Sequence, residues 1–173
     1  MPESKPPKPP RYQPGMVYAV PLADGAFGLA QAGGLMMPNV VYVALFLDRF
    51  DTLPSGPPPL APARVVSLAA TWRRNLNRGD WLALGVAAPV PGLDPHPTEA
   101  LAASGYVGAT HYDAGLLSEF LSACHGALPW NVMHDPAFFQ AMLLPGLARP
   151  AQAVVLGERE RTEYRRKTFG VNA

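Results

Sequence analysis

The sequence predicts an α+β fold, in which a twisted, mostly antiparallel sheet of about five to six strands in the first half is covered by two or three helices from the second half. Two patterns predict this class. Short β-prone runs separated by turn residues fill the chain up to residue 86, whereas amphipathic patterns with helical spacing begin only near residue 113. A chain of 173 residues, 49% of them hydrophobic, can bury a core without disulfides.

The predicted strands are rich in β-branched and aromatic residues and follow one another through short connections, which favours an antiparallel meander. Asp24 and Gly25 supply the first hairpin turn, and Gly33 and Gly34 are expected to end the second strand. The alanines of the fourth run would also permit a helix. The five predicted strands cover residues 16–22, 26–32, 40–47, 65–72 and 81–86.

Two helices are predicted in the second half. Asp113 can cap a helix that runs through Cys124, because apolar residues recur on one face of that segment at helical spacing. Asp135 and Pro136 are typical of a second helix start, and Trp130 is expected to plug the corner between the two helices. A last strand is expected over residues 153–156.

Composition divides the chain into three parts. Residues 1–14 are dense in proline and are expected to form a disordered arm, with a PxxP ligand as the alternative. Residues 15–157 are expected to form a single α+β domain. Residues 158–173 are polar and are expected to form a tail that is mobile or dependent on a partner.

Charge and cysteine content narrow the classes of function. The formal net charge is +1, whereas nucleic-acid binders usually have a strongly basic balance. The single cysteine allows no intramolecular disulfide, and no apolar run is long enough to span a membrane. We therefore expect a cytoplasmic protein with no membrane partner, for which a nucleic-acid partner is disfavoured.

Groups with catalytic potential gather in the 111–134 region, which contains three histidines, one cysteine and one aspartate. A small hydrolase built from these residues is an alternative function, but no nucleophile motif, metal-ligand spacing or cofactor fingerprint joins them. We expect no enzymatic activity, no cofactor and no metal. The residues concerned are His111, Asp113, Cys124, His125 and His134.

The segment from Trp72 to Trp81 is the most distinctive in the chain, because two tryptophans flank three arginines in a short connection. Tryptophan and arginine are enriched at the energetic centres of protein–protein interfaces. The same composition can bind nucleic acid, which is a further alternative, or can place two core tryptophans around an exposed basic hairpin. The candidate partner-binding residues are Trp72, Arg73, Arg74, Arg78 and Trp81.

Residues 15–31 read Gly-Met-Val-Tyr-Ala-Val-Pro-Leu-Ala-Asp-Gly-Ala-Phe-Gly-Leu-Ala-Gln and resemble the opening hairpin of the immunity protein 26 family of bacterial polymorphic toxin systems. The likeness covers about the first forty residues, and Met16 stands where an acidic residue is common in the family. The resemblance implies an α+β domain that binds and neutralises a cognate protein toxin without catalysis. Toxin immunity by direct protein–protein binding is therefore the expected function.

Overall fold

The computed structural model describes residues 5–93, 102–105 and 110–171. The beginning of the predicted arm, two segments of the predicted domain and the end of the predicted tail lie outside these residues.

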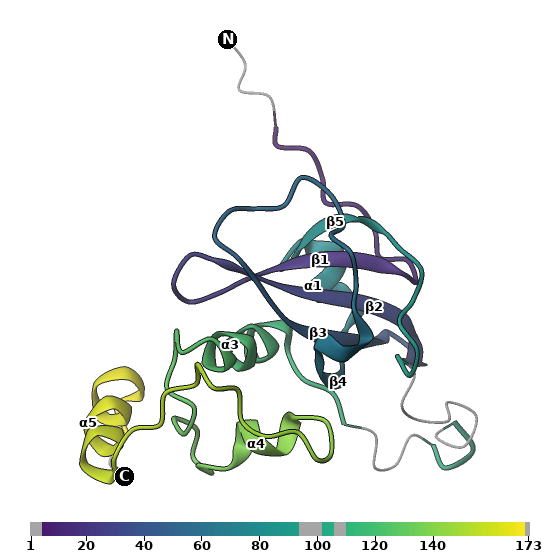
Figure 1. Ribbon diagram of the computed structural model, residues 1–173. Coiled ribbons are helices and arrows are strands. Elements are labelled where there is room, and N and C mark those ends of the chain that lie inside the picture. Colours follow the sequence, from purple (N-terminus) through teal and green to yellow (C-terminus); the bar gives the residue numbers. More distant parts are fainter. Residues whose placement is uncertain (1–4, 94–101, 106–109, 172–173) are drawn as a thin grey trace.

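A five-stranded antiparallel sheet forms the first half of the protein, and helices follow it, so the predicted α+β class is confirmed (Figure 1). Each strand corresponds to one of the predicted runs. The strands are β1 (Met16–Pro21), β2 (Phe27–Met37), β3 (Val40–Phe50), β4 (Val65–Trp72) and β5 (Leu82–Val86).

The strand order β4-β3-β2-β1-β5 departs from the expected meander, because β5 pairs with β1 instead of β4. The segment between β4 and β5, expected to be a turn, contains the short helix α1 (Arg73–Arg78). This helix separates β5 from β4 in the chain, and β5 lies at the far edge of the sheet (Figure 1). β1 therefore lies inside the sheet, and four of its residues are fully buried.

The expected break at Gly33 and Gly34 is wrong, because β2 continues to Met37 with irregular register around the two glycines. Gly33 allows Leu93 to pack closely against β2. A Cβ atom added there would lie 2.7 Å from Cγ of Leu93, so the segment after β5 can approach the strand only where a side chain is lacking.

Within residues 110–171, the helices are α3 (Ala114–Cys124), α4 (Phe138–Met142) and α5 (Glu158–Phe169). The Asp113 cap is confirmed, since its carboxylate accepts a hydrogen bond of 2.9 Å from the Gly115 amide. Asp135 likewise accepts from the Ala137 amide at 2.9 Å, although regular helix begins only at Phe138. The strand expected over 153–156 is reduced to one bridge between Val154 and Pro129.

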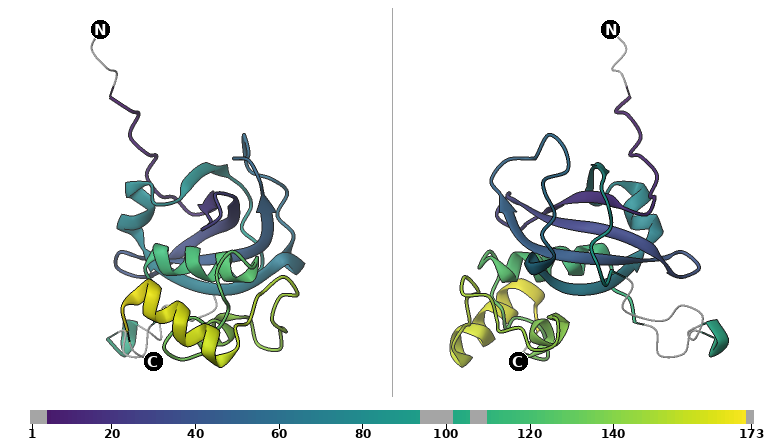
Figure 2. Two further views of the ribbon diagram at one scale, coloured as in Figure 1. Left: turned by 90° about the vertical axis from the view of Figure 1, so that its left-hand side faces the viewer. Right: turned by 45° about the vertical axis from the view of Figure 1, so that its right-hand side comes forward.

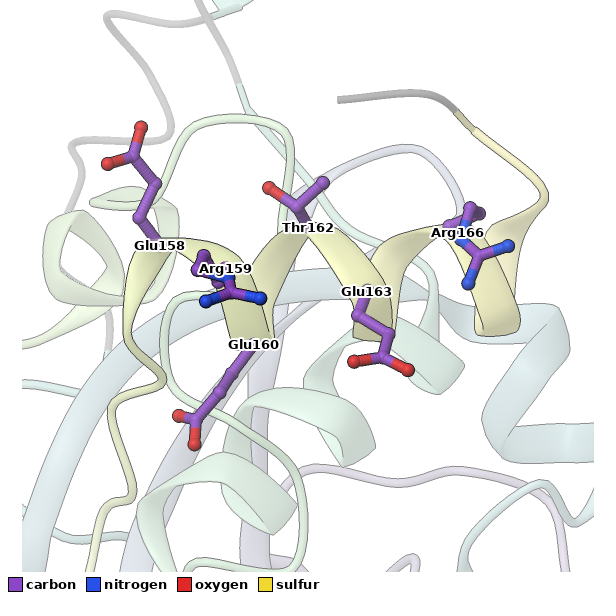
Figure 3. Close-up of a pocket in the computed structure, with 6 residues that line it drawn as sticks. All are labelled: Glu158, Arg159, Glu160, Thr162, Glu163 and Arg166. Carbon is purple, nitrogen blue, oxygen red and sulfur yellow. The ribbon is translucent and has the colours of Figure 1, made fainter.

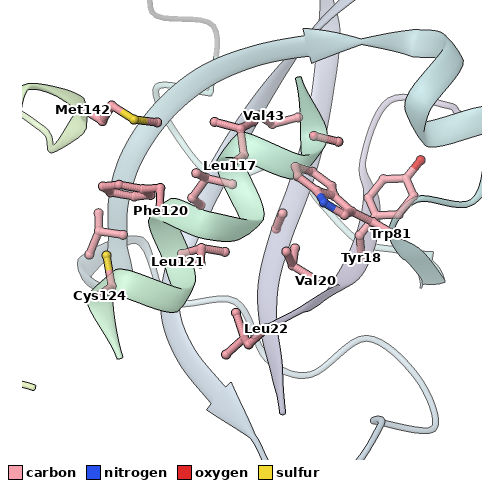
Figure 4. Packing of buried hydrophobic residues seen from close by; sticks show 14 of the residues in the cluster. Tyr18, Val20, Leu22, Val43, Trp81, Leu117, Phe120, Leu121, Cys124 and Met142 are labelled. Atoms are coloured by element: carbon pink, nitrogen blue, oxygen red, sulfur yellow. The ribbon is translucent and has the colours of Figure 1, made fainter. Parts of the chain in front are cut away.

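The core lies between the sheet and α3 (Figure 4). Leu117, Phe120 and Leu121 project from α3 toward the sheet and are fully buried. Trp130 fills the corner after α3 as expected, with its ring centre 6.0 Å from that of Phe120 and 5.8 Å from that of Phe139.

The polar tail is helical. Arg161 of α5 donates to the carbonyl oxygens of Asn131 and Met133, and Arg165 donates to that of Val132 at 2.8 Å. The helix thereby satisfies acceptors of the loop before α4, and α3 lies between the sheet and α5 (Figure 2). None of the helices in the described part of the chain is long and apolar enough to cross a bilayer.

The proline-rich arm is extended and exposed over residues 5–11, but it is anchored at Tyr12. The Tyr12 amide donates to Oδ1 of Asn77 at 2.7 Å, and its hydroxyl donates to the Gly33 carbonyl at 2.5 Å. Tyr12, near the inner end of the predicted arm, is therefore bonded to α1 and to β2.

Candidate partner-binding surface

Helix α1 carries the predicted arginines, and its inward-facing side chains fix it to the rest of the protein. Leu76 is buried in the core, and the buried amide of Asn75 donates to Oδ2 of Asp113 at 3.0 Å. Gly79, at φ 86°, ends the helix in the left-handed conformation, which favours glycine. The side chains on the outer side of α1 are thus presented by a short but well-supported element.

Trp81 does not belong to this surface, because only 1% of it is exposed. Its indole N–H donates to Oγ of Ser118 at 3.0 Å, and its ring meets the ring of Tyr18 edge to face at 6.1 Å. Trp81, which directly precedes β5, therefore contacts α3 inside the core, and a partner cannot reach it.

Arg78 lies on the surface but is already paired. Its guanidinium donates two hydrogen bonds to the carboxylate of Asp80, at 2.8 and 2.6 Å. A partner carboxylate would have to displace Asp80, so Arg78 contributes little free positive charge.

Trp72, Arg73 and Arg74 form the part of the predicted site that is both accessible and available. Trp72 is half-buried, with the centre of the His111 ring 4.3 Å from that of its own ring, edge to face, and the Arg74 guanidinium 5.2 Å from its ring centre. Neither Arg73 nor Arg74 forms an ion pair with a carboxylate of the described residues. We call these three residues the α1 surface.

Asn39 and Asn77, which were not predicted, lie beside the α1 surface. With Trp72, Arg73 and Arg74 they line a shallow cleft of about 360 Å³. Asn39 reaches it from the β2–β3 turn, where it adopts φ 66° after Pro38, and its carbonyl accepts from the Arg73 amide at 2.7 Å. The Pro-Asn pair is a turn signal in the sequence, but nothing local indicates that this turn meets α1.

The candidate catalytic groups do not converge. Cys124 is buried, and burial raises the pKa of its thiol to about 12, so the thiol is not ionised at neutral pH. Asp113 caps the other end of the same helix, about 16 Å away along its axis. Burial, together with Arg49, lowers the pKa of His125, which keeps this imidazole uncharged near neutral pH. His111 lies against Trp72.

No group of three or more histidine, cysteine or acidic side chains among the described residues could hold a metal ion. A hollow of about 770 Å³ runs along α5, but its side chains come from this one helix and project outward with mixed charges (Figure 3). Among them Glu163 is paired with Lys167 at 2.7 Å. This helix face is typical of a solvated surface and does not enclose a ligand.

Comparisons of the chain with protein-family models, with curated proteins and with solved structures found no match. The resemblance of residues 15–31 to the immunity protein 26 family thus stays a prediction from the sequence.

Proposed function

We propose that the protein is a non-catalytic binding protein that recognises another protein through the α1 surface. The observation that carries this proposal is the half-buried indole of Trp72 beneath Arg74, with Arg73 next in the chain, where neither arginine is ion-paired to a carboxylate of the described residues. Tryptophan and arginine dominate the binding energy of many interfaces, because they bury a large area and donate directed hydrogen bonds.

The rigidity of the surface supports the same proposal. Arg73 is held by two hydrogen bonds to Asn39, one from its amide at 2.7 Å and one from its guanidinium at 2.5 Å. Arg74 lies over the Trp72 ring. Side chains that are ordered before binding lose less conformational entropy when a partner docks.

The partner we propose is a cognate protein toxin, which the protein would neutralise by direct binding in the cytoplasm. The proposal takes its support from the sequence resemblance of the β1–β2 hairpin. The hairpin has the expected local form, since the Leu22 amide donates to the Ala26 carbonyl at 2.9 Å and Gly25 has φ 84°.

The test compares charge loss at two places. Tagged wild-type protein, Arg73→Ala/Arg74→Ala and Arg159→Ala/Arg166→Ala are used to capture partners from the source cells and from cells that express the products of adjacent genes. The control removes the same charge from exposed positions of α5. We expect the wild type and the control to capture the same partner and to protect cell growth against it. The Arg73→Ala/Arg74→Ala variant should lose both the capture and the protection.

Equal capture by all three proteins would contradict the assignment of the surface. Captured material that disappears after nuclease treatment, and whose binding falls steeply with salt, would favour the nucleic-acid alternative instead.

A further inference from the structure

The polar side chains that line the cleft beside the α1 surface are rich in hydrogen-bond donors. Two of its lining residues are arginines, which have no acceptor atom in their side chains. The two asparagines could contribute oxygen atoms, so their orientation decides the character of the cleft.

Both asparagine oxygens are already occupied by donors of the protein. Oδ1 of Asn39 accepts from Nη2 of Arg73 at 2.5 Å, and Oδ1 of Asn77 accepts from the backbone amide of Tyr12 at 2.7 Å. Each contact assigns the other end of the amide, the NH₂ group, as the free one. Neither NH₂ group has a partner among the residues that the structure describes.

Nearby carboxylates leave this donor set available. Asp113 interacts electrostatically with Arg74, but its oxygens already accept from the Gly115 amide and from the Asn75 side chain. Asp80 is bound by Arg78. The cleft therefore combines two guanidinium groups and two amide NH₂ groups beside an indole ring, and neither guanidinium is ion-paired to a carboxylate of the described residues.

We propose that this cleft is an oxyanion-binding site, which takes a carboxylate or a phosphate group. A guanidinium presents a fork of donors that can bind two oxygen atoms of a carboxylate or of a phosphate, and the two asparagine amides add neutral donors from two elements, the β2–β3 turn and α1. Only the identity of the macromolecule that carries the anion rests on the proposed function. If the protein binds a partner protein as proposed, an acidic side chain or the terminal carboxylate of that partner occupies the site.

The test titrates the full chain with sodium acetate and, separately, with inorganic phosphate, at constant ionic strength set by sodium chloride. The Trp72 indole N–H and the Arg74 Nε–H resonances report binding. We expect saturable shifts with at least one of the two anions, and the anion that binds more tightly identifies the source. Shifts that follow chloride equally well, or no saturable shift with either anion, would overturn the proposal.

Two variants separate the site from the fold. Asn77→Asp keeps the oxygen that Tyr12 needs and replaces the free NH₂ by a carboxylate oxygen, so it should weaken anion binding at least about tenfold at an unchanged melting temperature. Arg74→Gln, at an exposed position, should weaken it similarly. Gln152→Glu adds the same negative charge at a remote exposed position and should leave binding unchanged.

Unchanged affinity in both Asn77→Asp and Arg74→Gln would refute the site. Because the titration uses small anions and no partner, its failure is distinct from a failure to capture a protein through the α1 surface.

Discussion

Gln31 is a fully buried amide in β2 that ties the chain after β5 to the sheet. Its Nε2 donates to the carbonyl oxygens of Ala87 and Ala88 at 3.2 and 3.1 Å, and lies 3.4 Å from that of Gly15. Its Oε1 accepts from the Val90 amide at 3.0 Å. The side-chain amide thus bonds backbone carbonyl oxygens through its NH₂ group and a backbone N–H through its oxygen.

Replacement by leucine keeps the approximate shape and removes these bonds. The Val90 N–H would remain buried without an acceptor, at a cost of about 1–3 kcal/mol, and each lost bond to a carbonyl adds about 1 kcal/mol. The apolar side chain recovers part of this loss, so we expect Gln31→Leu to lower the free energy of unfolding by about 2–4 kcal/mol.

Gln31→Glu should be more damaging at pH 7, because a buried carboxylate would face carbonyl oxygens. Burial raises the pKa of such a glutamate above its unfolded value, so stability is lost as the pH rises through the unfolded pKa. The difference from the wild type should therefore shrink below about pH 4, where both states are protonated.

Urea unfolding measured between pH 3 and 8 tests both variants. Gln152→Leu and Gln152→Glu repeat the two changes at an exposed amide and should stay within about 0.5 kcal/mol of the wild type. A loss below about 0.5 kcal/mol for Gln31→Leu, or a pH-independent effect of Gln31→Glu, would refute the reasoning.

Three further outcomes test the core and the cap of α3. Phe120→Ala should cost about 3–5 kcal/mol of unfolding free energy, because Phe120 is fully buried against two aromatic rings, and a loss below about 1 kcal/mol would contradict that packing. Cys124, with its pKa raised to about 12 by burial, should react with a thiol reagent at pH 7.5 only as fast as the protein unfolds, and rapid labelling of the native state would place it elsewhere. Asp113→Ala should cost about 1 kcal/mol at pH 7. The Gly115 amide, and then the Asn75 side chain, hold the pKa of Asp113 below its usual value, so its stabilisation is present above the unfolded pKa and is lost as the pH falls through the folded value. A difference between wild type and Asp113→Ala that stays constant in urea unfolding from pH 7 to pH 2 would contradict this role.

The elements that the sequence predicts well are those whose signals are local. Helix α3 combines a capping aspartate with a buried face at regular spacing, and both features survive in the structure. The strands are equally readable, because their β-prone runs are separated by turns. The position of β5 is a different matter. It depends on the helix α1, which directs the chain from β4 to the other edge of the sheet. The asparagines of α1 have weak helix propensity, and tertiary contacts such as that of Asn75 with Asp113 override this propensity.

The site was predicted in part, for a comparable reason. Trp72 and Trp81 are equivalent in a composition-based view, but Trp81 precedes an exposed Leu82 and turns into the core, while Trp72 follows the buried Thr71 and turns outward. Burial does not alternate residue by residue along β4 or β5, so strand alternation alone does not separate the two tryptophans. The contribution of Asn39 could not be foreseen, since it arises from a turn more than thirty residues away in the chain that packs beside α1.

Helix α5 illustrates the limit of composition. Its charged residues indicate a solvated segment, yet Arg161 and Arg165, four residues apart, both reach carbonyl oxygens of the loop before α4. Such a contact depends on acceptors that the loop leaves free, which no pattern within α5 reveals.

The affinity of a recovered partner for Trp72→Ala tests the central claim most directly. A half-buried tryptophan at the centre of an interface contributes at least about 2 kcal/mol, so the dissociation constant should rise about thirtyfold or more relative to the wild type. Trp81→Phe, inside the core, should destabilise the fold but leave the affinity of the folded protein unchanged. An unaltered dissociation constant for Trp72→Ala would contradict the claim that the α1 surface binds the partner.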